Sequence, residues 1–303
     1  MEDWREALRH AIGAACGESP RRVEWQVLGG GEQNTFKLSG FSRAMFIKLA
    51  PAAADRYAAE ADGLRALGGD PATDAVDASR RRPRVPRVFA HGEAGEYDFL
   101  AIEYFDLQAA SAGDPRKLGA ALARLHADVG ESFGWPRDNF IGPTPQQNRP
   151  HADWVEFWRE RRLLPQLRLA HQAGFRGEAQ RRADTLLADF GAFFTDYRPR
   201  PSLLHGDLWH GNIGFIAAAE PVLYDPAVYR GDAEADLAMT ELFGGISPDM
   251  LAVYREHAGI DAGYAVRKHL YNLYHVLNHL VIFGGAYAAQ AAQLIDRVSS
   301  ELP

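Results

Sequence analysis

The sequence predicts an α+β protein in which a small antiparallel β-sheet with one main helix is followed by a larger, mostly helical part. Three observations favour this fold class: short alternating apolar stretches fill the first third of the 303 residues, helix-period apolar patterns fill the rest, and the change falls near residue 105. We therefore predict a bilobal chain, with lobes at residues 1–105 and 106–303. A crevice between two lobes is a natural ligand site.

The amino-terminal lobe is predicted to contain two helices and five strands. Apolar residues at helical spacing predict a helix over residues 1–19 and a second over residues 52–67, which ends at a glycine pair. The strands are expected at residues 23–28, 34–38, 45–49, 88–91 and 99–104. Residues 69–84 carry almost no large apolar side chain, so we expect a mobile loop there.

The carboxy-terminal lobe is predicted to be helical around one central motif. Helices are expected over residues 118–126, 154–173 (with a break near Pro165), 177–194, and from about residue 233 to the end, interrupted at two glycine pairs. Two short strands, at residues 202–204 and 222–224, bracket the central motif.

Composition excludes several kinds of protein. The net charge is −7, which argues against nucleic acid as the main partner, because binding a phosphate backbone needs concentrated Lys and Arg. A single cysteine, Cys16, allows no intrachain disulfide or cysteine metal cage and fits a reducing compartment. No apolar stretch approaches the ~18 residues of a membrane span. We therefore expect a cytoplasmic protein that binds neither membrane nor nucleic acid.

The central motif carries the chemistry. It reads His205-Gly206-Asp207, with Asn212 five positions after the aspartate, and Asp225 ends an apolar strand further on. Phosphoryl transfer from ATP needs a carboxylate that orients the attacking hydroxyl and oxygen ligands that hold Mg²⁺ against the phosphates. We assign the first role to Asp207 and the second to Asn212 and Asp225. The alternative is a buried turn in which Asp207 caps backbone amides. For His205 we expect a structural role.

Elements of a nucleotide site precede this motif. Glycines between two strands let backbone amides approach phosphates closely, and this turn consists of Gly29, Gly30 and Gly31. An ordinary hairpin turn is the alternative. On the third strand, Lys48 is predicted to pair with the phosphates and with Glu60, the only glutamate between residues 52 and 67. The alternative for Lys48 is an exposed strand face.

The end of the last strand in this lobe is predicted to bind adenine. Backbone groups of Glu103, Tyr104 and Phe105 follow an apolar run where a connection between the lobes is expected. The alternative is an edge strand with a polar end.

These parts together resemble a known family. The spacing His-Gly-Asp-x₄-Asn is similar to the catalytic loop of protein-kinase-like enzymes, with Gly in place of Arg as in aminoglycoside and choline kinases. Over nearly its full length the chain resembles the fructosamine (ketosamine) kinases. The specific marks lie at residues 133–148, 202–209, 225–239 and 277–285. Two departures are His210, where Ser is commoner, and the order of residues 32–34 in the glycine turn.

The resemblance implies a protein-kinase-like fold and a ketoamine substrate, a sugar joined through its first carbon to an amine, often a lysine of a glycated protein. The implied product is the 3-phosphate, which decomposes and frees the amine. Trp209 either stacks on the sugar or is a core tryptophan. Asp232 is a candidate partner for the cationic amine, and Asp236 is expected to anchor the catalytic loop.

Two other functions stay open on the sequence alone. The first is a kinase for another small hydroxyl compound, such as an aminoglycoside or a choline-like amine. The second is a nucleotide-binding module without catalysis, which would require the loss of at least one key residue. All five key residues are present in the chain, namely Lys48, Glu60, Asp207, Asn212 and Asp225.

Overall fold

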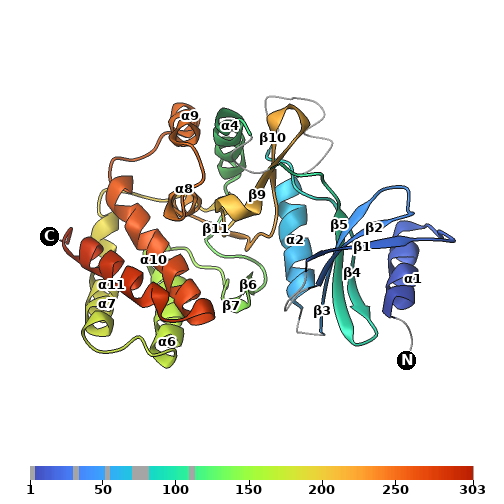
Figure 1. Cartoon of the computed structure of the whole chain (residues 1–303). Helices are drawn as coiled ribbons and strands as arrows, with labels where there is room; N and C mark the ends of the chain where they lie inside the picture. The colour runs from blue at the N-terminus through green and yellow to red at the C-terminus, as the bar shows by residue number, and fades with distance from the viewer. Residues whose placement is uncertain (1–3, 30–33, 52–54, 70–81, 109–112, 303) are drawn as a thin grey trace.

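A computed structural model describes residues 4–29, 34–51, 55–69, 82–108 and 113–302 of the chain. Figure 1 shows a β-sheet with its helices on one side of the molecule and a larger helical part on the other. The predicted α+β class and bilobal arrangement are confirmed. The lobe boundary at residue 105 stays a prediction, and residues 70–81 of the predicted mobile loop lie outside the described residues.

The amino-terminal part is built on a five-stranded sheet with strand order β1-β2-β3-β5-β4. Each neighbouring pair of strands is antiparallel. The five predicted strands are confirmed, with ends that move by up to three residues. Their bounds are β1 (Glu24–Gly29), β2 (Asn34–Ser39), β3 (Met45–Pro51), β4 (Val88–Ala94) and β5 (Tyr97–Glu103).

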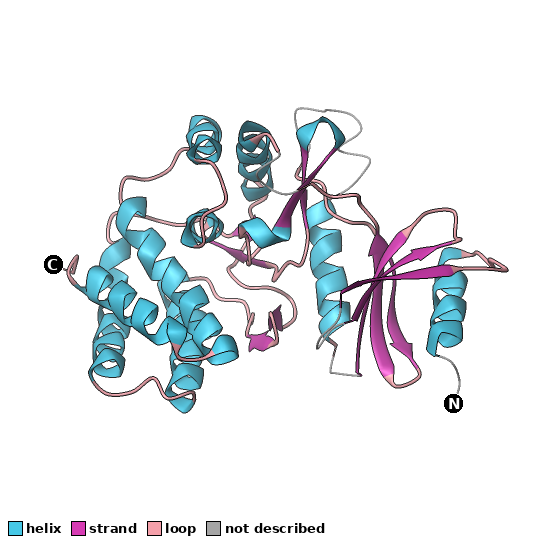
Figure 2. Ribbon diagram, viewed as in Figure 1, coloured by secondary structure: helices cyan, strands magenta, loops and turns pink. Residues whose placement is uncertain are grey.

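Helices cover both faces of this sheet, α1 (Trp4–Cys16) on one and α2 (Arg56–Gly68) on the other (Figure 2). Side chains of β5 alternate between the two faces. Phe99 and Ala101 belong to the apolar cluster beside α1, whereas Leu100 and Ile102 pack with α2. Burial on both faces explains why this strand is almost uninterruptedly apolar.

The carboxy-terminal part contains most of the helices. Within the described residues these are α4 (Pro115–His126), α5 (Trp154–Trp158), α6 (Leu164–Gln172), α7 (Glu178–Asp189), α8 (Ala233–Leu242), α9 (Pro248–Ala258), α10 (Tyr264–Phe283) and α11 (Ala286–Ser299). The irregularity expected near Pro165 is a π-helical turn, Arg159–Leu163, directly before α6. Proline cannot donate a backbone hydrogen bond, which disfavours a regular α-turn there.

Three two-stranded sheets position the central motif. Strand β8 (Ser202–Leu204) pairs with β11 (Tyr229–Gly231), and β9 (Ile213–Ile216) pairs with β10 (Glu220–Leu223). The third sheet pairs β6 (Asn139–Ile141) with β7 (Thr144–Gln146). Sequence patterns predicted β8 and β10 but missed the other four strands, which span three or four residues each. None of the helices in the described ranges is long and apolar enough to cross a membrane.

Candidate active site

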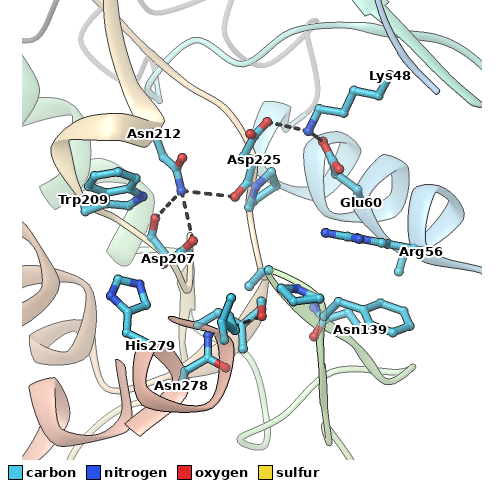
Figure 3. Close-up of a pocket in the computed structure, with 18 of the residues that line it drawn as sticks. Lys48, Arg56, Glu60, Asn139, Asp207, Trp209, Asn212, Asp225, Asn278 and His279 are labelled. Carbon is cyan, nitrogen blue, oxygen red and sulfur yellow. Dashed lines mark hydrogen bonds and ion pairs between the residues drawn. The ribbon is translucent and has the colours of Figure 1, made fainter. Parts of the chain in front are cut away.

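A cavity of about 250 Å³ lies where the two parts of the chain meet. Five residues predicted from the sequence line it together. They are Lys48 and Glu60 from the amino-terminal part, and Asp207, Asn212 and Asp225 from the carboxy-terminal part (Figure 3). The structure therefore brings these five predicted residues together around one cavity.

Lys48 joins the two parts. It lies on β3 and is buried, and its Nζ is 2.6 Å from Glu60 Oε1 and 2.6 Å from Asp225 Oδ1. Burial disfavours the ammonium ion, but the two carboxylates outweigh this effect and hold the pKa of Lys48 above its ordinary value. Lys48 is therefore a fixed cation at the cavity wall, suited to a phosphate. Burial in turn raises the pKa of Glu60, and Lys48 opposes that shift.

Asp207 and Asn212 lie side by side on the catalytic loop. The Asn212 Nδ2 donates to the backbone oxygen of Asp207 at 2.9 Å and to its Oδ2 at 3.1 Å. Burial raises the pKa of Asp207 to about 7, although the hydrogen bond from Asn212 favours the ionised form. The amide thus orients the carboxylate, and the carboxylate is a stronger proton acceptor than an exposed aspartate.

Asp236 anchors the loop that carries Asp207 by hydrogen bonds, as the sequence predicted. Its two carboxylate oxygens accept the backbone N–H groups of His205 at 2.7 Å and of Gly206 at 2.9 Å. Burial would raise the pKa of Asp236, but His126, the His205 side chain and the Gly206 amide lower it below its usual range. Gly206 has φ +83°, and a Cβ there would lie 2.1 Å from the Ala227 oxygen, so only glycine fits this position.

His205 has the structural role expected from the sequence. Its Nδ1 accepts the Asp207 N–H at 3.3 Å, so the Nε2 carries the proton and donates to the Tyr224 oxygen at 3.0 Å. Burial lowers the pKa of this imidazole, which keeps it neutral. His205 thereby ties the catalytic loop to the segment that ends at Asp225.

Asp225 lies in the left-handed region with φ +56°, its side chain is 48% exposed, and it lines the cavity. No group of three or more His, Cys, Asp or Glu side chains in the described part of the chain is arranged to hold a metal ion. The side chains at the cavity that would hold a cation are Asp225 and Asn212, the latter through its amide oxygen, together with phosphate oxygens of a nucleotide. Such a sparse oxygen set, completed by substrate phosphates and water, suits Mg²⁺.

The sequence of the chain matches the model of one protein family, described as fructosamine kinase, over residues 5–301. The chain belongs to the fructosamine kinase family. A probable ketoamine kinase from Synechocystis sp. is 37% identical, with 96% of each chain covered. The chloroplastic protein-ribulosamine 3-kinase of Arabidopsis thaliana is 38% identical over 71% of this chain and 67% of its own.

A solved structure gives the same result for the fold. The crystal structure of a putative fructosamine-3-kinase from Thermobifida fusca superposes with a TM-score of 0.84 at 28% identity, covering 97% of this chain and 98% of that one. The predicted fold and the resemblance to this family are confirmed.

Some predicted nucleotide residues of this family member lie apart from the cavity. Gly29 ends β1, and Gly30 and Gly31 lie outside the described residues. In the predicted adenine-binding segment, two backbone N–H groups already have partners within the fold. The Glu103 N–H donates to the backbone oxygen of Arg87 at 2.8 Å, and the Tyr104 N–H donates to the backbone oxygen of Ala44 at 3.2 Å. These two N–H groups therefore stabilise the fold of the lobe.

The amide of Phe105 has no such bond among the described residues. The assignment of backbone groups of residues 103–105 to adenine stays a prediction.

The structure does not bring Asp232 to this cavity. Its carboxylate is 1% exposed and accepts the hydroxyls of Tyr197 at 2.9 Å and Tyr271 at 2.5 Å. It also caps α8 and lines a separate cavity of about 630 Å³. A role for Asp232 against the substrate amine is therefore not supported, because two tyrosines and the helix end already occupy its oxygens.

Several side chains that line the cavity were not assigned from the sequence. Trp209 was assigned from the sequence as a residue that could stack on the sugar, and it lines the cavity. The Phe243 ring contacts Trp209 edge to face, with 5.8 Å between the ring centroids, and stacks on the His279 ring, with 4.9 Å between the centroids. Five of the unassigned lining residues are Arg56, Asn139, Asn278, His279 and Phe283. Four of them lie in the two segments, 133–148 and 277–285, that carry the family resemblance, which was the available signal.

Proposed function

We propose that this chain transfers the γ-phosphoryl group of ATP, with Mg²⁺, to a sugar hydroxyl of a ketoamine and so initiates the removal of the sugar from an amine. The observation that carries the proposal is the convergence of Lys48 and Glu60 with Asp207, Asn212 and Asp225 on one cavity. The family supports it, because its curated relatives bear the names ketoamine kinase and protein-ribulosamine 3-kinase.

The arrangement divides the reaction between the two sides of the cavity. Lys48, held by Glu60, binds the phosphates, and Asp207 orients the attacking hydroxyl and accepts its proton. Asn212 and Asp225 would hold Mg²⁺, which supplies positive charge to the transferred phosphoryl group. Because catalysis of phosphoryl transfer is mostly positioning and electrostatics, the rigid loop under Asp207 is the main contribution of the protein.

The aromatic side of the cavity is the position that we propose for the substrate sugar. Trp209, His279 and Phe283 line this side, and Phe283 is 66% exposed. Sugar C–H groups pack on aromatic faces, and an exposed aromatic ring near the mouth suits the carbon chain of the amine that bears the sugar. The substrate class is thus a small ketoamine or a glycated lysine side chain. The single cysteine supports a reducing, cytoplasmic location.

An ATP-consumption assay with a substrate panel tests the proposal. The panel contains a model fructosamine, a ribulosamine, an aminoglycoside and choline, each with Mg²⁺ and with EDTA. We expect turnover of at least one ketoamine, dependence on Mg²⁺, and release of free amine after phosphorylation. Turnover of the aminoglycoside or choline alone would assign a different substrate. Binding of Mg-ATP without turnover of any compound would favour the non-catalytic alternative.

A further inference from the structure

Three buried amide side chains connect the β6–β7 hairpin to the turn that follows Asp225. Asn139, Gln146 and Asn148 are 5%, 2% and 0% exposed. The Gln146 Nε2 donates to the backbone oxygen of Ala227 at 3.1 Å. The Asn139 Nδ2 donates to the backbone oxygen of Val228 at 2.7 Å. Both carbonyls lie within three residues of Asp225, so the hairpin holds this turn through its backbone.

The hydrogen bonds of this network run in one direction. Arg162 can only donate, and its Nη2 donates to Asn148 Oδ1 at 2.7 Å. The Asn148 oxygen is therefore an acceptor, and the Asn148 Nδ2 donates to Asn139 Oδ1 at 2.8 Å. The same Asn139 oxygen accepts a second hydrogen bond, from the Gln146 Nε2 at 2.8 Å. Backbone carbonyls can only accept, so the other end is fixed as well. A buried cation at one end and two carbonyls at the other leave each amide a single orientation.

The turn is one that needs support. Asp225 has φ +56°, which residues other than glycine rarely adopt, and such a conformation persists only where its surroundings determine it fully. Pro226 follows and has no N–H to contribute. The Ala227 N–H donates to the His205 oxygen at 2.9 Å, and the opposite side of Ala227 is held by Gln146. The turn is thus fixed between the catalytic loop and the hairpin.

We propose that Gln146 and Asn139 are positioning residues that hold Asp225 in its metal-binding conformation before any nucleotide arrives, with Arg162 setting the direction of the network. This proposal rests on the proposed function, because it takes Asp225 as a ligand of Mg²⁺. The turn is then held by the β6–β7 hairpin together with the loop that carries His205, with no nucleotide or metal bound. Gln146 and Asn139 act through the backbone at Ala227 and Val228 and touch no reacting atom.

The test replaces Gln146 by methionine, which keeps its length and removes the donor. The matched control is Gln147→Met, because Gln147 is the neighbouring residue and is exposed. Gln146→Met removes the hydrogen bonds of Gln146 with Ala227, Asn139 and Tyr274. Since one lost hydrogen bond corresponds to about a fivefold change, we expect amide hydrogen exchange of the nucleotide-free protein at Ala227 and Val228 to rise about fivefold or more. Binding of Mn²⁺ with a non-hydrolysable ATP analogue, followed by electron paramagnetic resonance, should weaken by a similar factor. The control should match the parent protein in both.

A second variant separates positioning from general packing. Leu186→Ala in α7 removes a buried side chain far from the cavity and should lower the melting temperature without changing either readout. If Gln146→Met behaves like Leu186→Ala, with parental exchange at Ala227 and parental Mn²⁺ affinity, the proposal is wrong. If Gln146→Met does not fold, Asn139→Ser replaces it in both measurements, because this substitution removes the donor to the Val228 oxygen.

The two proposals fail in different ways. A parent protein that binds no Mn²⁺ with the nucleotide analogue refutes the proposed metal role of Asp225. Unchanged exchange at the turn in both network variants refutes the positioning role, and this measurement needs no nucleotide or metal.

Discussion

Asp207 is the residue on which turnover depends most in the proposed reaction. Asparagine at this position keeps the size of the side chain and can still accept the hydrogen bond from Asn212. Asp207→Asn should therefore leave the loop in place and remove only the proton acceptor. We expect kcat to fall about 10³-fold, within the usual range for a general base, while ATP affinity stays the same. Steady-state kinetics and calorimetric titration of nucleotide check this.

The control for Asp207→Asn is Asp196→Asn, a substitution of the same chemistry at an exposed site away from the cavity. It should retain parental kcat. Equal losses in the two variants would contradict the assignment of Asp207.

At the residue scale, the sequence predicted the groups whose spacing along the chain is dictated by the chemistry. Asp207 and Asn212 lie on one loop, so their separation survives as a linear motif. The position of Asp232 away from the cavity was not predictable, because the direction of its side chain depends on Tyr197 and Tyr271, which are distant in the sequence. His279 carried no chemical signal of its own, since an aromatic position on a helix is typical of a core residue, and only its place in the family-like segment 277–285 pointed to it.

At the scale of elements, Lys48 links strand β3, helix α2 and the segment after β10 through two short ion pairs. Removing one partner of a buried pair leaves the other charge without compensation. Lys48→Met should therefore lower the free energy of unfolding by ~3 kcal/mol, near the lower limit for buried pairs because Asp225 is half-exposed. Urea denaturation of the variant measures the loss.

A double variant identifies the cause of that loss. Lys48→Met with Glu60→Gln removes the uncompensated carboxylate and should recover part of the stability. As a control, Lys268→Met breaks a more exposed pair with Glu241 and should cost no more than ~1 kcal/mol. No recovery in the double variant would show that the packing of the lysine stem, and not its charge, stabilises the fold.

Elements were predictable where a periodic pattern was long enough to read. The strands of the large sheet are six or seven residues long and all were predicted. Strands β6 and β7 have three residues each, and Pro145 interrupts the pattern of the second. Their hairpin is defined by contacts that its amide side chains make with the distant residues Ala227 and Val228. Local patterns hold no information on such contacts.

At the scale of the whole molecule, the core around the site contains imidazoles that must stay neutral. His275 lies on α10 and is 4% exposed. Burial, with further effects of His279 and Arg162, lowers the pKa of His275 to about 3, although Asp236 opposes the shift. Its Nδ1 is 3.9 Å from Asp207 Oδ1, but a neutral imidazole forms no ion pair there.

This burial makes the stability of the fold depend on acidity. In the unfolded chain an imidazole has a pKa of about 6.5, so the unfolded state binds a proton below that pH while the native state does not until about pH 3. The contribution of His275 is therefore fully present above pH 6.5 and is lost as the pH falls. Each pH unit below 6.5 should cost ~1.4 kcal/mol of unfolding free energy from this residue.

Substitution of His275 should remove that dependence. Between pH 7.5 and pH 5.5, the unfolding free energy measured by urea denaturation should fall by ~1.4 kcal/mol less in His275→Gln than in the parent protein. Exposed His171 serves as the control, because its imidazole meets water in the folded and unfolded states alike, so His171→Gln should keep the parental pH dependence. His205 is also buried with a lowered pKa, so some acid sensitivity should persist in His275→Gln. An unchanged slope in His275→Gln would mean that the native state admits a proton at this position.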